Sequence, residues 1–298
     1  MADELELLRR ANPVPADAPH FGDGPLDHHA ERRLNRLMRQ RTSRRPRLLW
    51  GLAATAVVGA LVAALLFTDQ TTAPAVAAPR PLVVQADSTP VSLETLAARA
   101  RARAAGGSPA LRKGTHVKSW SMGMSEDKPP ITYPEERIVR WNADDSHTET
   151  VDDGHDRTTR TYPPSWSDAP PQSPPPLDVT RLRAYLQETL HIDTAPDTGQ
   201  LLDGVGVLLD HWTLGARESA VLVQLLADAE GLKPVGQVTD RLGRRGQAYV
   251  YEQSVSRQML IMDPATGAVL GLETTFTEAD PEYGVKAGDV MDYSAWMR

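Results

Sequence analysis

The run Leu48–Phe67 (LLWGLAATAVVGALVAALLF) constrains this chain more than any other feature of the sequence. It holds twenty residues with no charged side chain and no proline. At a helical rise of about 1.5 Å per residue the run is about 30 Å long, which matches the hydrocarbon core of a bilayer. The sequence therefore predicts one transmembrane helix, and the chain is expected to fold as two parts on opposite sides of a membrane.

Basic residues on the two sides of this run predict its orientation. The first basic residue after the run is Arg80, whereas five arginines stand immediately before it: Arg39, Arg41, Arg44, Arg45 and Arg47. Basic residues are retained on the cytoplasmic side of a membrane helix. We therefore expect a single-pass protein of the cell membrane, with a cytoplasmic N-terminus and an extracytoplasmic C-terminal domain.

A cleaved signal peptide is the alternative interpretation of the apolar run. Ala75-Val76-Ala77 has the small-x-small form of a cleavage site, so the sequence leaves open cleavage after Ala77. However, a signal peptide has a short basic start and an apolar core of about 7 to 15 residues. The preceding 47 residues and the twenty-residue core favour a retained anchor.

Net charge and cysteine content exclude several classes of function. Residues 1–47 carry ten Arg against seven acidic residues, a balance of +3, and the remainder carries a balance of −10. An acidic outer part argues against a nucleic-acid partner bound by charge. The chain has no cysteine, which excludes disulfides and zinc sites built on thiolates.

Hydrophobic periodicity and turn residues divide the chain into segments. The apolar spacing of Asp27–Gln40 predicts a cytoplasmic helix that either lies on the inner leaflet or docks a protein partner. The predicted organisation is a cytoplasmic Arg-rich tail (1–47), the transmembrane helix (48–67), an Ala/Pro/Thr-rich linker (68–91) and an extracytoplasmic domain (92–298) that contains a Pro-rich crossover (163–176).

Strand-like and helix-like segments alternate in blocks within the predicted outer domain. Ser92 can cap a helix to about Ala105, and four period-two segments up to residue 162 predict a meander. Seven prolines among residues 163–176 exclude a helix there. Three helical segments follow up to Ala229, and the last third of the chain again has the pattern of strands. The turn Asp263–Gly267 predicts a hairpin. This order predicts an α+β fold: an antiparallel sheet with helices packed on one face.

The order of these segments resembles that of a known family. The matching features are DELELLRRANP at the start, the Arg-rich stretch before the membrane run, a Trp-bearing strand after Gly114, a helix-rich middle, and RQMLIMDPATGAVLGLET near the end. On these features the chain resembles actinobacterial single-pass membrane proteins of uncharacterised function, which are often encoded beside extracytoplasmic-function sigma factors. The resemblance implies a membrane-anchored regulator, anti-sigma-like in topology, with a sigma factor as a cytoplasmic partner. The His-x3-Cys-x2-Cys pattern of zinc anti-sigma domains is absent, because the chain has no cysteine.

Motifs for catalysis and for cofactor binding are missing from the sequence. There is no G-x-S-x-G, H-E-x-x-H, P-loop or complete G-x-G-x-x-G pattern, so we assign no catalytic or cofactor-binding residue and expect no enzyme. Gly204-Val205-Gly206 is a partial glycine match inside a helical pattern, and a small-residue packing contact is favoured over phosphate binding.

An acidic run is the strongest metal candidate, because carboxylate and imidazole ligands lie close in sequence. An EF-hand loop that started at Asn142 would need Gly and Glu where the chain has His147 and Asp153. Two solvated hairpin turns are therefore favoured, and no metal ligand is assigned. The run comprises Asp144, Asp145, His147, Asp152, Asp153, His155 and Asp156.

Two functions remain open at this point. The first is a non-enzymatic envelope sensor or regulator, which the predicted topology and the missing catalytic motifs favour. The alternative is an envelope carrier or binding module for a lipid or another apolar ligand, because a curved sheet covered by helices can enclose an apolar cavity. Such a cavity could be lined by some of the tryptophans outside the membrane run, namely Trp120, Trp141, Trp166, Trp212 and Trp296.

Overall fold

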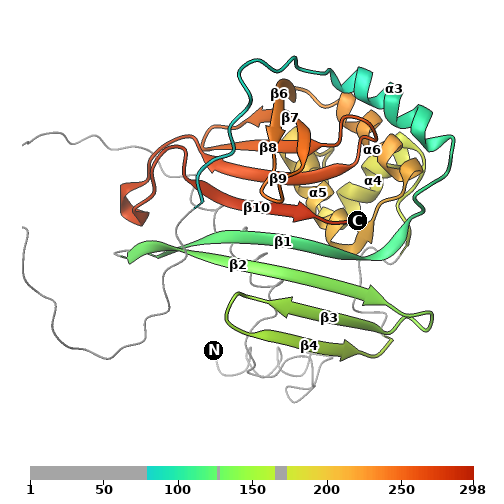
Figure 1. Cartoon of the computed structure of the whole chain (residues 1–298), viewed down its shortest axis with the longest axis horizontal. Coiled ribbons are helices and arrows are strands. Elements are labelled where there is room, and N and C mark those ends of the chain that lie inside the picture. The colour runs from blue at the N-terminus through green and yellow to red at the C-terminus, as the bar shows by residue number, and fades with distance from the viewer. Residues whose placement is uncertain (1–78, 126–127, 165–172) are drawn as a thin grey trace, which may run out of the picture. The chain divides into compact units, whose positions relative to one another are not determined.

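The computed structural model describes residues 79–125, 128–164 and 173–298 (Figure 1). They belong to one compact unit, Gln70–Arg298. The predicted tail and the predicted transmembrane helix lie outside the described residues. Among the residues that are described, no helix is long and apolar enough to cross a membrane.

Helices and strands follow one another in the blocks that the sequence predicts. In chain order the elements are α3 (Leu93–Ala104), β1 (Arg112–Ser125), β2 (Lys128–Trp141), β3 (His147–Asp152), β4 (Arg157–Tyr162), α4 (Val179–Leu190), α5 (Thr198–His211), β5 (Trp212–Thr213), α6 (Ala216–Ala227), β6 (Lys233–Thr239), β7 (Arg245–Glu252), β8 (Ser256–Met262), β9 (Val269–Phe276), the 3-10 helix η1 (Pro281–Tyr283) and β10 (Val290–Trp296).

One antiparallel sheet of ten strands organises the domain. Nine strands lie in the order β4-β3-β2-β1-β10-β9-β8-β7-β6, and the short β5 pairs with β1. The last strand, β10, thus joins the β1–β4 meander to the β6–β9 meander, with Val117 opposite Trp296 on one side and Tyr293 opposite Glu273 on the other. The predicted α+β class with an antiparallel sheet is confirmed.

The helices pack together on one face of the sheet, and α4, α5 and α6 lie behind β6–β10 in Figure 1. Leu186, Leu202 and Leu226 of three different helices share one apolar core with Leu260 and Leu272 of the sheet. This burial supplies the main driving force for the fold. The prediction that the helices cover one face of the sheet is confirmed.

Local caps explain where the helices begin. The Ser92 hydroxyl accepts the Thr95 N–H at 3.2 Å, and the Asp178 carboxylate accepts the Arg181 N–H at 2.9 Å. Asp197 forms a capping box with Gln200. Each cap satisfies backbone donors that the first helical turn leaves open, which stabilises a helix by about 1 kcal/mol.

The predicted hairpin turn at Asp263–Gly267 is confirmed between β8 and β9. The Asp263 carboxylate accepts the N–H groups of Ala265 and Thr266 at 2.8 and 2.9 Å. Gly267 has a φ of +71°, which only glycine adopts without strain.

A second, smaller core fills the face of the sheet opposite the helices. Val238, Val250 and Ile261 are buried there, and Leu82 and Val84 from the start of the described chain pack against them. The central strands are therefore buried on both faces. This second core is the setting of the site described next.

Candidate functional site

The segment that precedes α3 binds the edge of the sheet. Val84 forms an antiparallel bridge with Val238 of β6. The N–H of Gln85 donates to the carbonyl of Gln237 at 2.8 Å. We call residues 79–88 the tether. The sequence assigned this stretch to a linker, and the structure places it in the fold.

A glycine in β6 makes room for the tether. Gly236 has a φ of +122° at an irregularity in the pairing of β6 with β7. A Cβ atom at this position would overlap the hydroxyl oxygen of Ser88. That oxygen accepts the N–H of Gln237 at 2.8 Å. Glycine is thus required here both for its backbone conformation and for the close approach of the tether.

A buried ion pair holds the backbone of the tether. Arg241 lies in the turn between β6 and β7, and its guanidinium pairs with the Glu273 carboxylate of β9. Oε1 of Glu273 accepts the N–H of Leu82 at 2.8 Å, and Arg241 donates to the carbonyl of Arg80 at 2.6 Å. The Glu273 side chain is 1% exposed, so each of these bonds replaces one to water.

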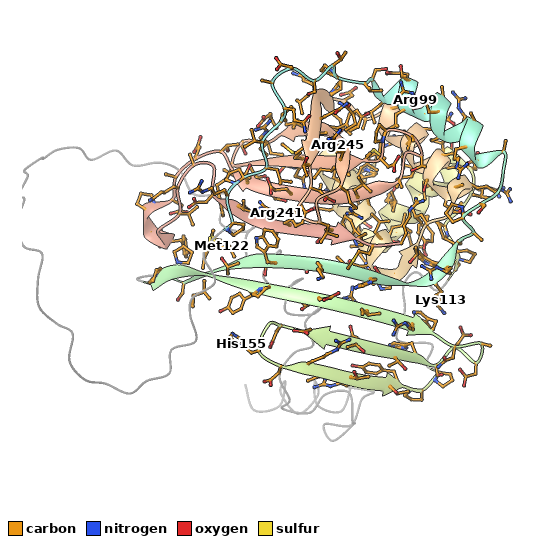
Figure 2. All side chains as sticks on the ribbon, in the orientation of Figure 1. Arg99, Lys113, Met122, His155, Arg241 and Arg245 are labelled. Atoms are coloured by element: carbon orange, nitrogen blue, oxygen red, sulfur yellow. The ribbon has the colours of Figure 1, made fainter. Side chains whose placement is uncertain are left out.

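Two aromatic rings complete this arrangement. The Arg241 guanidinium carbon lies 4.4 Å from the ring centre of Trp120 and 5.1 Å from that of Tyr293. The two rings are themselves 4.9 Å apart. A cation over aromatic faces is stabilised by the ring quadrupoles. We call Arg241, Glu273, Trp120 and Tyr293 the clasp; Arg241 lies over β9 and β10 in Figure 2.

Strand register brings the clasp residues together. Trp120 is opposite Tyr293, and Tyr293 is opposite Glu273, so the three side chains form a row on one face of β1, β10 and β9. Arg241 reaches them because its turn is braced: Asp240 accepts the N–H of Arg244 at 2.8 Å and its Nε at 2.7 Å. The clasp is therefore set by contacts between strands that are distant in sequence.

The protonation of the clasp follows from burial. Burial raises the pKa of Glu273, and the N–H of Leu82 and the charge of Arg241 oppose this rise. Burial also raises the pKa of Tyr293 to about 12. Both oxygens of Glu273 are engaged, Oε1 by the tether and Oε2 by Arg241. This geometry suits a group that holds the tether rather than one that exchanges protons with a substrate.

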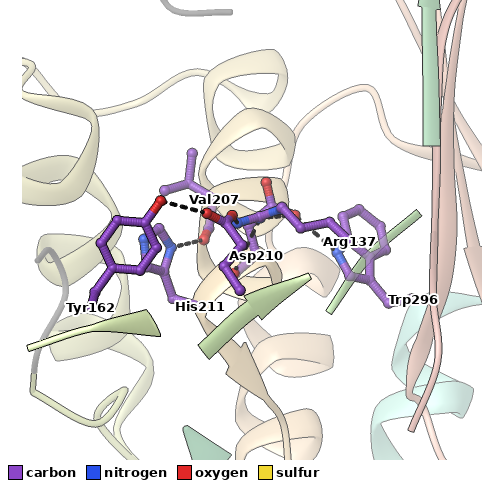
Figure 3. A network of polar contacts seen from close by, with 7 residues as sticks. Arg137, Tyr162, Val207, Asp210, His211 and Trp296 are labelled. Carbon is purple, nitrogen blue, oxygen red and sulfur yellow. Dashed lines mark hydrogen bonds and ion pairs between the residues drawn. The ribbon is translucent and has the colours of Figure 1, made fainter. Parts of the chain in front are cut away.

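A second polar network joins the β2–β4 strands to the rest of the domain (Figure 3). The Arg137 side chain is 5% exposed; it pairs with Glu149 at 3.4 Å and with the Asp210 carboxylate at 3.6 Å. Asp210 also accepts the indole N–H of Trp296 at 3.2 Å, and Glu149 accepts the Tyr162 hydroxyl at 3.4 Å. The network thus connects β2, β3 and β4 to α5 and β10. We call it the strut.

A column of rings crosses the strands beside the strut. His147 stacks between Trp141 and Tyr162, with ring centres 4.4 and 4.7 Å apart. The Lys113 ammonium lies 3.7 Å from the centre of the Trp141 ring. Cross-strand pairs of this kind stabilise a sheet, so the column reinforces the β1–β4 meander.

The acidic run forms two hairpin turns, as the sequence predicts. Asp144 accepts the Ser146 N–H at 3.0 Å, and Asp153 accepts the N–H groups of His155 and Asp156 at 2.9 and 2.8 Å. These bonds lower the pKa of the Asp144 carboxyl, chiefly through Ser146, and that of Asp153, chiefly through Asp156.

The two turns lie at opposite ends of β3, so the acidic run is not one cluster. Asp145 binds Lys113 at 3.0 Å at one end, and His155 lies at the other (Figure 2). His147 sits in the ring column described above. Within the described ranges, no group of three or more His, Asp or Glu residues is placed to hold a metal ion.

The glycine pair in α5 contains a helix-packing contact. A Cβ atom on Gly204 would lie 3.3 Å from the Leu190 side chain and 3.4 Å from that of Leu186, whereas one on Gly206 would meet nothing within 4 Å. Gly204 therefore lets α5 pack closely on α4. Both glycines lie within the helix rather than in a phosphate-binding loop, which agrees with the packing prediction.

A small cavity lies between the helices and β10. Trp212, Trp296 and Leu209 line it, and its volume is about 20 Å³. A cavity of this size holds about one water molecule. Of the other tryptophans, Trp120 belongs to the clasp and Trp141 to the ring column, while Trp166 lies outside the described residues.

Sequence reasoning missed both charged residues of the clasp. Glu273 is the only acidic residue within the strand VLGLETTF, which the structure buries on both faces over most of its length. An acid inside such an apolar strand is a usable signal of a buried ion pair. Nothing in the sequence near Arg241 distinguishes it from Arg244 or Arg245, so its partner could not be named in advance.

Comparisons with known proteins assign no family. No protein-family model and no curated protein matches the chain. Among solved structures, a dehydratase domain from the CurK module of the curacin polyketide synthase aligns over 66% of this chain and 77% of its own, at 10% identity and a TM-score of 0.13. A TM-score this low carries no argument about fold or activity.

Proposed function

We propose that this chain is a membrane-anchored, non-enzymatic regulator of the cell envelope. Its N-terminal tail lies in the cytoplasm, one helix at residues 48–67 spans the membrane, and the sheet domain lies outside. The tail is available to a cytoplasmic protein such as a sigma factor.

The observation that carries this proposal is that two side chains of the clasp, Arg241 and Glu273, bind the backbone of the tether. Arg80 and Leu82 follow the predicted membrane helix closely in sequence, and both are bonded to side chains of the clasp. A domain whose first residues are fixed this way can transmit a displacement to its anchor.

The proposed cytoplasmic partner is supported by the composition of the tail and by the family resemblance. Ten arginines in residues 1–47 suit the inner leaflet, and the helix predicted at Asp27–Gln40 offers an apolar face to a partner. Without cysteine, any contact with a sigma factor uses a surface other than a zinc domain.

A carrier for lipids or other apolar ligands is the competing function. Ligand sites of that kind have volumes of about 300–1,000 Å³. The cavity at Trp212 and Trp296 has about 20 Å³. A cavity of that size is too small for such a ligand, so these two tryptophans do not line a carrier site.

Affinity purification of the full chain from cross-linked membranes tests the proposal. We expect a sigma factor to be enriched with the full chain and lost when residues 1–47 are deleted. A tag at the C-terminus should be cleaved by protease added to intact spheroplasts. Recovery of the chain in the soluble fraction, or a cytoplasmic C-terminus, would contradict the topology; equal enrichment without the tail would contradict the partner.

A further inference from the structure

Exposed apolar side chains gather at one end of the sheet. Ile131 and Tyr133 near the start of β2 are 53% and 55% exposed, and Val255 in the turn before β8 is 54% exposed. Large apolar side chains are usually buried, and a group of exposed ones marks an interaction surface. We call Ile131, Tyr133 and Val255 the apolar end.

Strand register places these residues at the same level. Ile131 is opposite Gly123 of β1, two residues beyond Ser121, which is opposite Asp292 of β10; Val290 lies two residues before Asp292, across an irregularity of β10. Val290 is opposite Thr275 of β9, which is opposite Arg257, two residues after Val255. Four strand spacings of about 4.8 Å separate β2 from β8, so the apolar end is about 20 Å wide.

The tether approaches the sheet beside this end. Arg241 bonds to the carbonyl of Arg80 and lies over the ring of Trp120. Trp120 is opposite Pro134, and the next residue, Tyr133, points to the other face of β2 at the same end of the sheet. Val83, on the tether itself, is 79% exposed. The blue-green segment before α3 accordingly descends to the ends of β9 and β10 that lie nearest the β1–β2 hairpin (Figure 1).

Chain length limits how far this end can lie from the membrane. The predicted membrane helix ends at Phe67, and the described chain begins at residue 79. Twelve residues span at most about 40 Å when fully extended. We propose that the apolar end contacts the outer surface of the lipid bilayer, with Tyr133 and Ile131 at the level of the headgroups. This inference rests on the proposed membrane anchor.

The chemistry of the apolar end fits a bilayer interface. Tyrosine is enriched at membrane interfaces, because its ring is apolar and its hydroxyl is polar. The ring of Tyr133 lies across Gly123, where any Cβ atom would overlap it. Glycine thus allows the ring to pack directly against β1.

Acidic residues around the apolar end specify the kind of lipid surface. Glu252 is paired with Arg257, and its side chain is 61% exposed. Asp280 and Glu282 of the η1 turn are exposed, and Gly284 of that turn lies near Pro130 of the β1–β2 hairpin. Arg257 balances the charge of Glu252, whereas the carboxylates of Asp280 and Glu282 are repelled by anionic headgroups, so a zwitterionic surface is the better partner.

Because the chain has no cysteine, single labels can be placed on it without interference. The full chain is reconstituted into phosphatidylcholine nanodiscs and labelled with an environment-sensitive fluorophore at Tyr133→Cys, Ile131→Cys or Val255→Cys. The matched control is Ala265→Cys, an exposed position in the turn at the other end of β8. Lipids that carry a spin label at the headgroup then act as quenchers.

We expect a label at position 133 or 131 to lose about half of its emission to headgroup quenchers, while the label at 265 loses none. Replacing half of the phosphatidylcholine with phosphatidylglycerol should weaken the quenching at 133. If the chain does not copurify with the nanodiscs, the proposed anchor fails. If it copurifies but the labels at 131, 133 and 255 are quenched no more than the one at 265, the membrane contact is overturned and the anchor stands.

Discussion

The backbone N–H of Leu82 donates to the carboxylate of Glu273 at 2.8 Å, across 191 positions of sequence. One partner belongs to the segment that leads to the predicted membrane helix, and the other is buried in the sheet. Because Glu273 is also the counter-ion of Arg241, the attachment of the tether and the pairing of a buried charge depend on the same side chain.

Substitution of Glu273 should therefore separate these two roles. Glu273→Ala leaves Arg241 without its counter-ion and Leu82 without its acceptor, and we expect a loss of about 3–5 kcal/mol in the free energy of unfolding. Glu273→Gln keeps an acceptor for Leu82 and should cost about 1–2 kcal/mol. Urea unfolding of the fragment 70–298 measures both values. Equal losses would show that the lost charge of Glu273 accounts for the whole effect and that the acceptor for Leu82 contributes nothing.

The raised pKa of Glu273 predicts a pH dependence of stability. Burial lifts this pKa above its ordinary value of 4.5, so the folded protein binds a proton more readily than the unfolded chain. The free energy of unfolding should then fall as pH rises from 4.5 through the raised pKa. Comparing the melting temperature of the native fragment with that of Glu273→Gln across this range isolates the effect. If the melting temperature of the native fragment rose with pH relative to that of Glu273→Gln, this prediction would be contradicted.

Two glycines of α5 provide a matched pair of substitutions. Gly206→Ala should stabilise the fragment by about 0.5–1 kcal/mol, because alanine favours helix and nothing lies within 4 Å of the added Cβ. Gly204→Ala gains the same propensity but presses on Leu186 and Leu190, so it should be less stable than Gly206→Ala. Unfolding of both variants in urea checks the order, and the reverse order would refute the close contact between α4 and α5.

Local features of the fold could be predicted from sequence, and contacts between distant strands could not. The caps at Ser92 and Asp178 and the turn at Asp263 depend on neighbouring residues, so short patterns identify them. Antiparallel pairing within each meander follows from consecutive strands. The insertion of β10 between β1 and β9 has no local signal, because the order of distant strands depends on how both faces of the sheet are buried.

The clasp was missed for the same physical reason. Arg241, in the β6–β7 turn, and Glu273, in β9, are 32 positions apart, and they meet because this turn folds over the sheet. The bound tether was also unexpected, since an Ala/Pro/Thr-rich composition is typical of linkers. Leu82 and Val84 face the second core, whereas Val83 between them is exposed. This period-two alternation is typical of a strand, but the Ala/Pro/Thr-rich composition around it concealed the pattern.

Because the strut joins β3 and β4 to the rest of the domain, substitution of Arg137 should destabilise these strands more than the remainder of the sheet. Arg137→Met removes a charge that is 5% exposed and leaves Glu149 and Asp210 without it, so we expect a loss of about 3 kcal/mol. Hydrogen exchange should rise most in β3 and β4, which the strut joins to α5. Arg160→Met, on the exposed edge strand, is the control and should change stability by less than about 0.5 kcal/mol. An equal rise in hydrogen exchange across the whole sheet would contradict this role of the strut.

Replacement of Arg241 should release the tether while the sheet stays folded. Arg241→Lys keeps the positive charge, but it loses the planar group that binds Glu273, the carbonyl of Arg80 and the ring of Trp120 together. We therefore expect faster hydrogen exchange at the Leu82 amide in Arg241→Lys, and faster still in Arg241→Met, which leaves Glu273 unpaired. Exchange at Leu260 should change far less, because Leu260 belongs to the core under the helices, whereas Tyr293 and Trp120 of the clasp belong to the second core. Arg245→Lys, at an exposed position on the next strand, is the matched control. If Leu82 exchanges at the native rate in Arg241→Met, then Glu273 alone holds the tether and Arg241 only balances its charge.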